Sequence, residues 1–155
     1  PDPSTVVFAP NTHEFVVRVL ASLPARRVPR VLTTDAEFHS LTRQLARLEE
    51  EGLVAVTRVP TVPHATLGER LAEAARAGFD LVWVSEVFFS SGFVLDGLEE
   101  VVTACGEAVV VIDGYHSFMA RPVDLSRLAG RVFYTAGGYK YAMAGEGCCF
   151  LHCPP

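Results

Sequence analysis

The fold of this chain is decided by residues 109–150, which read VVVIDGYHSFMARPVDLSRLAGRVFYTAGGYKYAMAGEGCCF. This stretch holds Lys140, the only lysine in 155 residues, against twelve arginines. Such a preference for arginine indicates that Lys140 does something that a guanidinium cannot do. A primary amine can lose its proton and add to an aldehyde, whereas arginine stays charged. Lys140 is therefore the first candidate for chemistry, and a chance surface lysine is the alternative.

Two predicted strands bring an acid close to this lysine. Residues 108–112 form a continuous apolar run, typical of a buried strand, and Asp113 follows directly. A second strand over 131–135 leads to Lys140 through two glycines, which allow close approach of a ligand. Open α/β sheets bind ligands at the carboxyl ends of their strands, so we expect Asp113 and Lys140 in one crevice. An acid for a protonated ring nitrogen and a lysine for an aldehyde are the groups that pyridoxal phosphate needs.

The same stretch resembles the class V aminotransferase group of fold type I pyridoxal phosphate enzymes. The resemblance is carried by IDGYH at 112–116, YTAGGYKY at 134–141 and GEGCCFL at 145–151, and it covers nearly the whole chain. Within this group, the Asp-x-x-His and Tyr-Lys-Tyr patterns look most like kynureninase and its relatives. Cysteine desulfurases usually carry Asp-x-x-Gln and His-Lys instead.

The resemblance implies roles for four residues of this stretch. Lys140 would hold the cofactor as a Schiff base and then act as general base at the α-carbon of an amino acid substrate. Asp113 would keep the pyridine nitrogen protonated, which lets the ring draw electrons. His116, the third catalytic residue, would hydrogen-bond near the ring phenolate or the substrate. Tyr139 would offer its hydroxyl group to the cofactor phosphate.

Further cofactor contacts are expected from two upstream segments. A turn after the first strand supplies a helix N-cap, and the free N–H groups at such a helix start bind anions. In the family this turn holds the cofactor phosphate, so Asn11, Thr12 and His13 fall on phosphate-binding positions, although Asn11 replaces the commoner glycine. Phe38 is the expected stacking partner of the pyridine ring, with His39 as the reserve. An ordinary capped helix and a core phenylalanine are the plain alternatives.

The pattern predicts one α/β domain over residues 1–155, a three-layer α/β/α sandwich. Strands are expected over 5–8, 29–33, 53–59, 81–84, 108–112, 131–135 and 147–151, and helices over 13–23, 35–51, 67–77 and 94–104. Helical crossovers make six strands parallel, whereas the last follows the lysine loop too closely and is expected to be antiparallel. The resemblance implies a seven-stranded, mostly parallel sheet of order 3-2-4-5-6-7-1, the large domain of a fold type I transferase. Because the chain begins with Pro1 and ends in two prolines, we expect that an N-terminal segment and a C-terminal small domain are absent.

Composition narrows the classes of function. The net charge is −5 and the arginines are scattered, which disfavours nucleic acid and anionic membranes as partners. No apolar run reaches the roughly 20 residues of a membrane span, and no signal peptide is recognised, so a cytoplasmic location is expected. Cys148 and Cys149 would point to opposite faces of a strand, so we expect neither a disulfide nor a metal site there.

The reaction is left open by the sequence. Transamination, Cβ–Cγ hydrolysis of a kynurenine-like substrate, β-elimination and desulfuration use the same groups, and the residues that bind the substrate carboxylate are expected outside this chain. A kynureninase-like hydrolase or lyase is favoured, with a class V aminotransferase or a cysteine desulfurase-type lyase as the alternative. A non-catalytic binding or regulatory module is the alternative from another class.

Two further expectations concern Glu86 and the assembly. Glu86 follows the fourth predicted strand, at the level of the cofactor site. A carboxylate beside the cofactor phenolate would be repulsive unless it were protonated or paired, so no role is assigned to it. The resemblance implies that the full-length protein is a homodimer.

Overall fold

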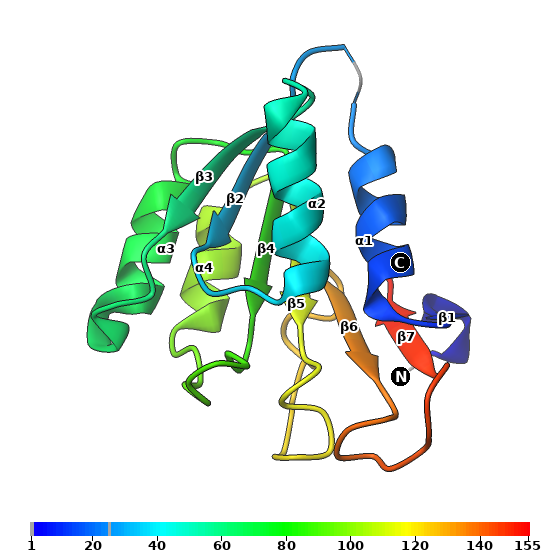
Figure 1. Ribbon diagram of the computed structural model, residues 1–155. Coiled ribbons are helices and arrows are strands. Elements are labelled where there is room, and N and C mark those ends of the chain that lie inside the picture. The colour runs from blue at the N-terminus through cyan, green and yellow to red at the C-terminus, as the bar shows by residue number, and fades with distance from the viewer. Residues whose placement is uncertain (1, 25) are drawn as a thin grey trace.

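A seven-stranded sheet forms the centre of the computed structural model, which describes residues 2–24 and 26–155 (Figure 1). The strands are β1 (Val6–Ala9), β2 (Arg30–Thr34), β3 (Ala55–Val59), β4 (Leu81–Ser85), β5 (Val109–Asp113), β6 (Phe133–Gly137) and β7 (Cys149–His152). Their order across the sheet is β1-β7-β6-β5-β4-β2-β3. Strand β7 is antiparallel to both of its neighbours, and the other six strands share one direction. The predicted order, read from the opposite edge, and the predicted reversal of the last strand are confirmed.

Helices cover both faces of this sheet, as the three-layer prediction requires. The α-helices among the described residues are α1 (Thr12–Ala21), α2 (His39–Glu50), α3 (Leu67–Ala75) and α4 (Leu98–Ala104). Helices α1 and α2 lie on one face, and α3 and α4 lie on the other (Figure 1). Successive side chains of a strand point to opposite faces. In β4, Leu81 and Trp83 therefore pack under α1 and α2, whereas Val82 and Val84 pack under α3 and α4.

Helix α2 begins at His39, so the predicted start at position 35 was wrong. The intervening residues form a turn in which side chains take the hydrogen bonds. The Asp35 carboxylate accepts the N–H of Thr61 at 2.8 Å. The Thr34 hydroxyl group donates to the carboxylate of Glu37 at 2.7 Å. Asp and Thr side chains compete in this way with helix hydrogen bonds, which delays the first helical turn.

Helix α4 begins at Leu98, so the predicted start at position 94 was also wrong. Val94 pairs with Val87 in an isolated antiparallel bridge, which holds this part of the chain extended. Gly97 then adopts a positive φ of 71° at the N-cap, a conformation that glycine enters without steric cost. The segment between β4 and α4 is therefore a folded-back loop rather than an additional helical turn.

The carboxyl ends of the central strands meet at one edge of the sheet. Ser85 of β4 lies opposite Asp113 of β5, and Asp113 lies opposite Thr135 of β6. On the other side of β6, Gly137 pairs with Cys149, which pairs in turn with Ala9 just before α1. The start of α1 is thereby placed beside the end of β6. Within the described residues, no helix has the length and hydropathy of a membrane span.

Gly68→Ala is expected to destabilise the domain by about 1–3 kcal/mol, the usual cost of overpacking. Gly68 lies in α3, and a Cβ atom there would overlap the carbonyl oxygen of Asp96. The overlap opposes the gain that alanine normally brings to a helix. Urea denaturation measures the loss. Gly130→Ala is the matched control, because a Cβ atom there meets nothing within 4 Å, and equal stabilities would contradict this close packing.

Candidate functional site

A pocket opens at the carboxyl ends of β4, β5 and β6, next to the start of α1. Its walls come from separate segments of the chain that the sheet brings together. The lining residues are Asn11, Thr12, Phe38, Ser40, Ser85, Val87, Phe89, Asp113, Tyr115, His116, Tyr139 and Lys140. Apart from His13 and the reserve stacking residue His39, every residue that the sequence indicated for the cofactor site lines this pocket.

Asp113 is the buried acid of the pocket. It ends β5 and is only 7% exposed. Its carboxylate accepts the N–H of Tyr115 at 3.0 Å. Burial raises the pKa of Asp113 to about 6, while this hydrogen bond and the charge of Lys140 act in the opposite direction. A cation placed in the pocket would stabilise the ionised form of Asp113 further.

Lys140 reaches the pocket from the loop that follows β6. Its Nζ forms a hydrogen bond with Nε2 of His116 and lies 5.0 Å from the centre of the Tyr115 ring. Burial lowers the pKa of Lys140, and the charge of Asp113 opposes this change. Burial and the charge of Lys140 both lower the pKa of His116. Both changes favour the neutral forms, so the amine of Lys140 loses its proton more readily than that of an exposed lysine.

Aromatic rings form one wall of the pocket. Phe38 stacks on His39 with ring centres 5.4 Å apart and meets the edge of Phe89 at the same distance. The Nζ atom of Lys140 lies 5.4 Å from the centre of the Phe38 ring. This places the expected stacking residue beside the expected reactive amine. A planar aromatic ligand that met Lys140 would have an aromatic face available to it.

The start of α1 contributes hydrogen-bond donors to the pocket. The side chain of Asn11 caps the helix by accepting the N–H of Glu14 at 3.2 Å. Asn11 and Thr12 line the pocket together with Tyr139. The N–H groups of a first helical turn, with the positive end of the helix dipole, favour an anion such as a phosphate. His13 lies in the same turn, but its side chain is exposed and does not line the pocket.

Two glycines are required by the packing around Asp113. A Cβ atom on Gly114 would overlap the ring of Tyr134, and one on Gly137 would overlap the ring of Tyr115. Both tyrosines are buried, so neither ring can move aside cheaply. The glycines therefore allow Tyr115 and Tyr134 to brace the segment that carries Asp113.

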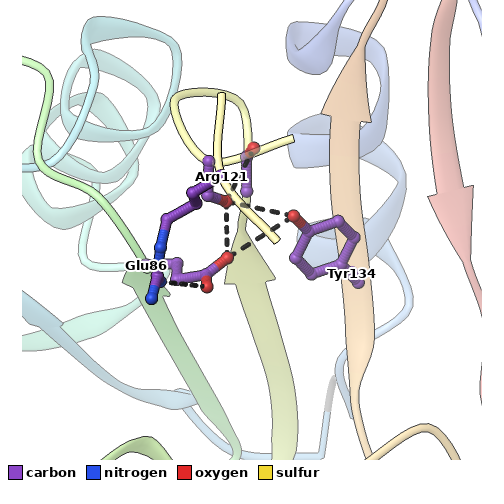
Figure 2. Close-up of polar contacts among 5 residues, drawn as sticks. Glu86, Arg121 and Tyr134 are labelled. Carbon is purple, nitrogen blue, oxygen red and sulfur yellow. Dashed lines mark hydrogen bonds and ion pairs between the residues drawn. The ribbon is translucent and has the colours of Figure 1, made fainter. Parts of the chain in front are cut away.

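Glu86 does not line the pocket, and its carboxylate is paired (Figure 2). Arg121 donates to it at 3.0 Å, the Ser117 hydroxyl group at 2.5 Å and the Tyr134 hydroxyl group at 3.5 Å. The Ser117 hydroxyl oxygen also lies 3.0 Å from the carbonyl oxygen of Gly114, which is an alternative acceptor for its single proton. This network connects the 113–121 segment to the residue after β4. Glu86 therefore has a structural role outside the cofactor site.

Sequence reasoning missed four polar residues at or beside the pocket. Ser40, Ser85 and Tyr115 line it, and Glu37 is buried beside it with hydrogen bonds to Thr34 and Ser85. Position was the available signal for Ser85 and Tyr115, which come just after predicted strands, whereas Glu37 and Ser40 fell inside a predicted helix. Their burial depends on contacts between segments far apart in the chain, and no local pattern reports such contacts.

The groups around the pocket fit one cofactor. A deprotonatable amine held with a buried carboxylate, an aromatic face and a helix N-terminus is the set that pyridoxal phosphate requires for its aldehyde, ring nitrogen, ring and phosphate. Fold and site together place the chain among the fold type I pyridoxal phosphate-dependent enzymes. More particularly, the chain belongs to the class V aminotransferase family, whose family model matches residues 1–154.

Solved structures with the same fold include several enzymes of sulfur metabolism. An apo cysteine desulfurase from Thermococcus onnurineus NA1 has a TM-score of 0.82 at 22% identity, over 97% of this chain and 38% of that chain. The cystine C-S lyase C-DES, solved with its product cysteine persulfide, has a TM-score of 0.80 at 26% identity, over 98% and 42%. A lysine-to-alanine variant of C-DES, with glycine covalently linked to its PLP cofactor, has a TM-score of 0.80 at 24% identity, over 98% and 41%.

This chain corresponds to only part of each of these solved structures. The chain spans about two fifths of the length of each of these structures. No curated protein gives a significant match to the sequence. The solved neighbours named here carry desulfurase or C-S lyase chemistry, and none of them is a kynureninase.

Arg121→Met is expected to destabilise the domain by about 1–3 kcal/mol, because it leaves the buried Glu86 carboxylate with hydroxyl partners alone. Methionine keeps most of the aliphatic packing of the arginine. Urea denaturation measures the change. Arg127→Met is the matched control, since Arg127 pairs at 3.5 Å with an exposed Glu99, and such a surface pair contributes at most about 1 kcal/mol. Equal losses in both variants would argue against a bracing role for Glu86.

Proposed function

We propose that this chain is the cofactor-binding part of an enzyme that uses pyridoxal phosphate to cleave a bond in the side chain of an amino acid. One observation carries the proposal: Lys140 and Asp113 line a single pocket. Burial lowers the pKa of the Lys140 amine, which makes it a better nucleophile and base at neutral pH. A non-catalytic module would have no use for such an amine.

The residues of the pocket divide the work between them. Lys140 holds the cofactor through its amine and, once released, removes the α-proton of the substrate as general base. Bound pyridoxal phosphate supplies the electron sink for the charge left on the α-carbon. Asp113 pairs with the ring nitrogen and keeps it protonated. His116 orients the Lys140 amine through the hydrogen bond between their side chains.

The phosphate and the ring would be held by the remaining lining residues. Asn11, Thr12 and the hydroxyl group of Tyr139 are proposed to hold the phosphate at the start of α1. The side chain of His13 is exposed, so we propose that this residue contacts the phosphate through its backbone N–H. Phe38 is proposed to stack on the pyridine ring. These contacts use the anion preference of a helix start and the flat face of an aromatic side chain.

Carbon–sulfur bond cleavage in a cysteine-like substrate is the reaction that we propose first. It is supported by the likeness to the C-S lyase C-DES, at 26% identity over 98% of this chain. Kynureninase-like hydrolysis is the second candidate. It is supported by His116 and by the Tyr139-Lys140-Tyr141 sequence, the two positions at which the chain departs from the usual desulfurase pattern.

Assembly and location complete the proposal. We propose a homodimer for the full-length protein, in line with the family resemblance. We also propose that it acts in the cytoplasm. Cys105, Cys148, Cys149 and Cys153 are all free thiols, which suits a reducing compartment.

Lys140→Ala is expected to abolish covalent attachment of the cofactor. In the wild-type protein, borohydride treatment after incubation with pyridoxal phosphate should add the mass of the reduced cofactor to the peptide that contains Lys140. The variant has no other lysine to accept it. Peptide mass mapping and the absorbance spectrum provide the measurement. Tyr141→Phe is the control, because Tyr141 is exposed and lies next to the lysine, and it should keep the band. A wild-type protein without a reducible band would move the non-catalytic module to first place.

Product analysis of the full-length protein separates the two candidate reactions. With cysteine or cystine as substrate, carbon–sulfur cleavage is expected to release sulfide or a persulfide. With kynurenine, hydrolysis between Cβ and Cγ would release alanine and an aromatic acid. We expect the rate of sulfur release from cysteine or cystine to exceed the rate of alanine release from kynurenine by at least about tenfold at equal substrate concentration. This ratio corresponds to a difference of about 1.4 kcal/mol in activation free energy. The reverse ratio would establish the kynureninase-like reaction instead.

A further inference from the structure

Glu37 is a second buried carboxyl group beside the site, and the proposed chemistry does not use it. It lies in the turn between β2 and α2 and is 3% exposed. Its Oε1 atom contacts the hydroxyl group of Thr34 at 2.7 Å, and its Oε2 atom contacts that of Ser85 at 2.5 Å. All ion pairs among the described residues involve other acids, so Glu37 is buried without a cation partner.

Ser85 connects Glu37 to the pocket. It ends β4, lines the pocket and lies opposite Asp113 in the register of β4 and β5. A serine hydroxyl group can donate one hydrogen bond and accept others. If Glu37 is ionised, the Ser85 hydroxyl group must donate its hydrogen bond to that carboxylate. If Glu37 is protonated, it can donate to Ser85, and the Ser85 proton is free to point into the pocket.

The surroundings decide which of the two buried acids keeps a proton. The charge of Asp113 acts on Glu37, and two buried carboxyl groups that interact do not both ionise readily. The anion of Asp113 is stabilised by the N–H of Tyr115 and by the charge of Lys140, whereas Glu37 has only neutral partners, the hydroxyl groups of Thr34 and Ser85 and, as the weakest contribution, the backbone N–H of Ser85. Burial raises the pKa of Glu37 to about 7, and the charge of Asp113 adds to the increase.

Other ionisable groups near Glu37 do not change this assignment. Asp35 and His39, on the same turn and at the start of α2, are both exposed to solvent. Asp113, at the end of β5, is the charged group that acts on Glu37 from a neighbouring strand. The contacts from β2 and β4 are all uncharged, namely the hydroxyl groups of Thr34 and Ser85 and the backbone N–H of Ser85.

We propose that Glu37 is a positioning residue that holds its proton more firmly than Asp113 does and acts through Ser85. Its proton leaves Asp113 as the single charged carboxylate of the site, and its hydrogen bond to Ser85 turns the serine proton toward the pocket. The effect on the cofactor rests on the proposed function, whereas the protonation of Glu37 does not. Glu37→Gln mimics the protonated acid at every pH, because an amide keeps a donor and an acceptor in the same shape.

The first test uses the protein without cofactor. An acid with a raised pKa in the folded state binds its proton more tightly there than in the unfolded chain, so it stabilises the fold at low pH. That stability is lost as the pH rises from the unfolded pKa, near 4.5, through the folded pKa, about 7. The thermal midpoint of Glu37→Gln relative to wild type should therefore rise by about 3 °C or more between about pH 5 and about pH 8.5.

Glu107→Gln is the matched control for this measurement, because Glu107 is exposed and precedes β5, at the opposite end of that strand from Asp113. Its thermal midpoint should run parallel to that of wild type across the same pH range. A Glu37→Gln curve that also ran parallel to wild type would overturn the proposal, because Glu37 would then titrate alike in the folded and unfolded states.

The second test adds pyridoxal phosphate and measures its affinity at neutral pH by fluorescence. Glu37→Gln should bind it within about threefold of wild type, whereas Asp113→Asn should bind at least about tenfold more weakly, about 1.4 kcal/mol. Equal weakening in both variants would overturn the proposal, since it would show that the site needs the charge of Glu37. If the wild-type protein bound no pyridoxal phosphate, the proposed function would be wrong, and so would the role of Glu37 toward the cofactor. The pH comparison would still show whether Glu37 is protonated in the folded protein.

Discussion

The negative charge of Asp113, held at the end of a buried strand, is the constraint on which the rest of the site depends. A carboxylate in such a place is costly unless donors and opposite charge surround it. The N–H of Tyr115 and the amine of Lys140 provide these, and each has a fixed position because of its own neighbours. Tyr115 fits only because position 137 is a glycine. The requirement to bury a charged Asp113 therefore restricts which residues can surround it, as well as which groups can bind in the pocket.

The same edge of the sheet places three buried carboxyl groups among three different sets of partners. Glu86 is paired with Arg121 and serves the architecture. Asp113 is buried but faces the amine of Lys140, which favours its charge. Glu37 has neutral hydrogen-bond partners and no cation partner. Glu37 and Asp113 are buried to a similar extent, so the higher pKa of Glu37 comes from its partners rather than from its depth of burial.

Much of the fold and part of the site could be predicted from the sequence. The apolar run before Asp113 and the short link between Lys140 and the last strand fix the direction of β5 and β7, and the family resemblance supplied the strand order. Local sequence patterns did not predict the start of α2 or the partners of Glu86, because both depend on side chains from distant segments. The turn before α2 is held by Thr61, and the network of Glu86 depends on Arg121, 35 residues away. Neither contact leaves a periodic signal in the sequence.

The loop that carries Lys140 is closed at its base by the sheet itself. Gly137 and Cys149 pair across β6 and β7, and the N–H of Gly138 bonds to the carbonyl oxygen of Cys148 at 2.7 Å. Lys140 lies only three residues beyond β6, so its position is set from that side. Residues 141–147 are largely exposed and begin after the lysine. Met143 and Ala144 bond back to the carbonyl oxygens of Lys140 and Gly138, so the exposed residues after them are the part of this segment that evolution can lengthen, shorten or replace while the amine stays in place.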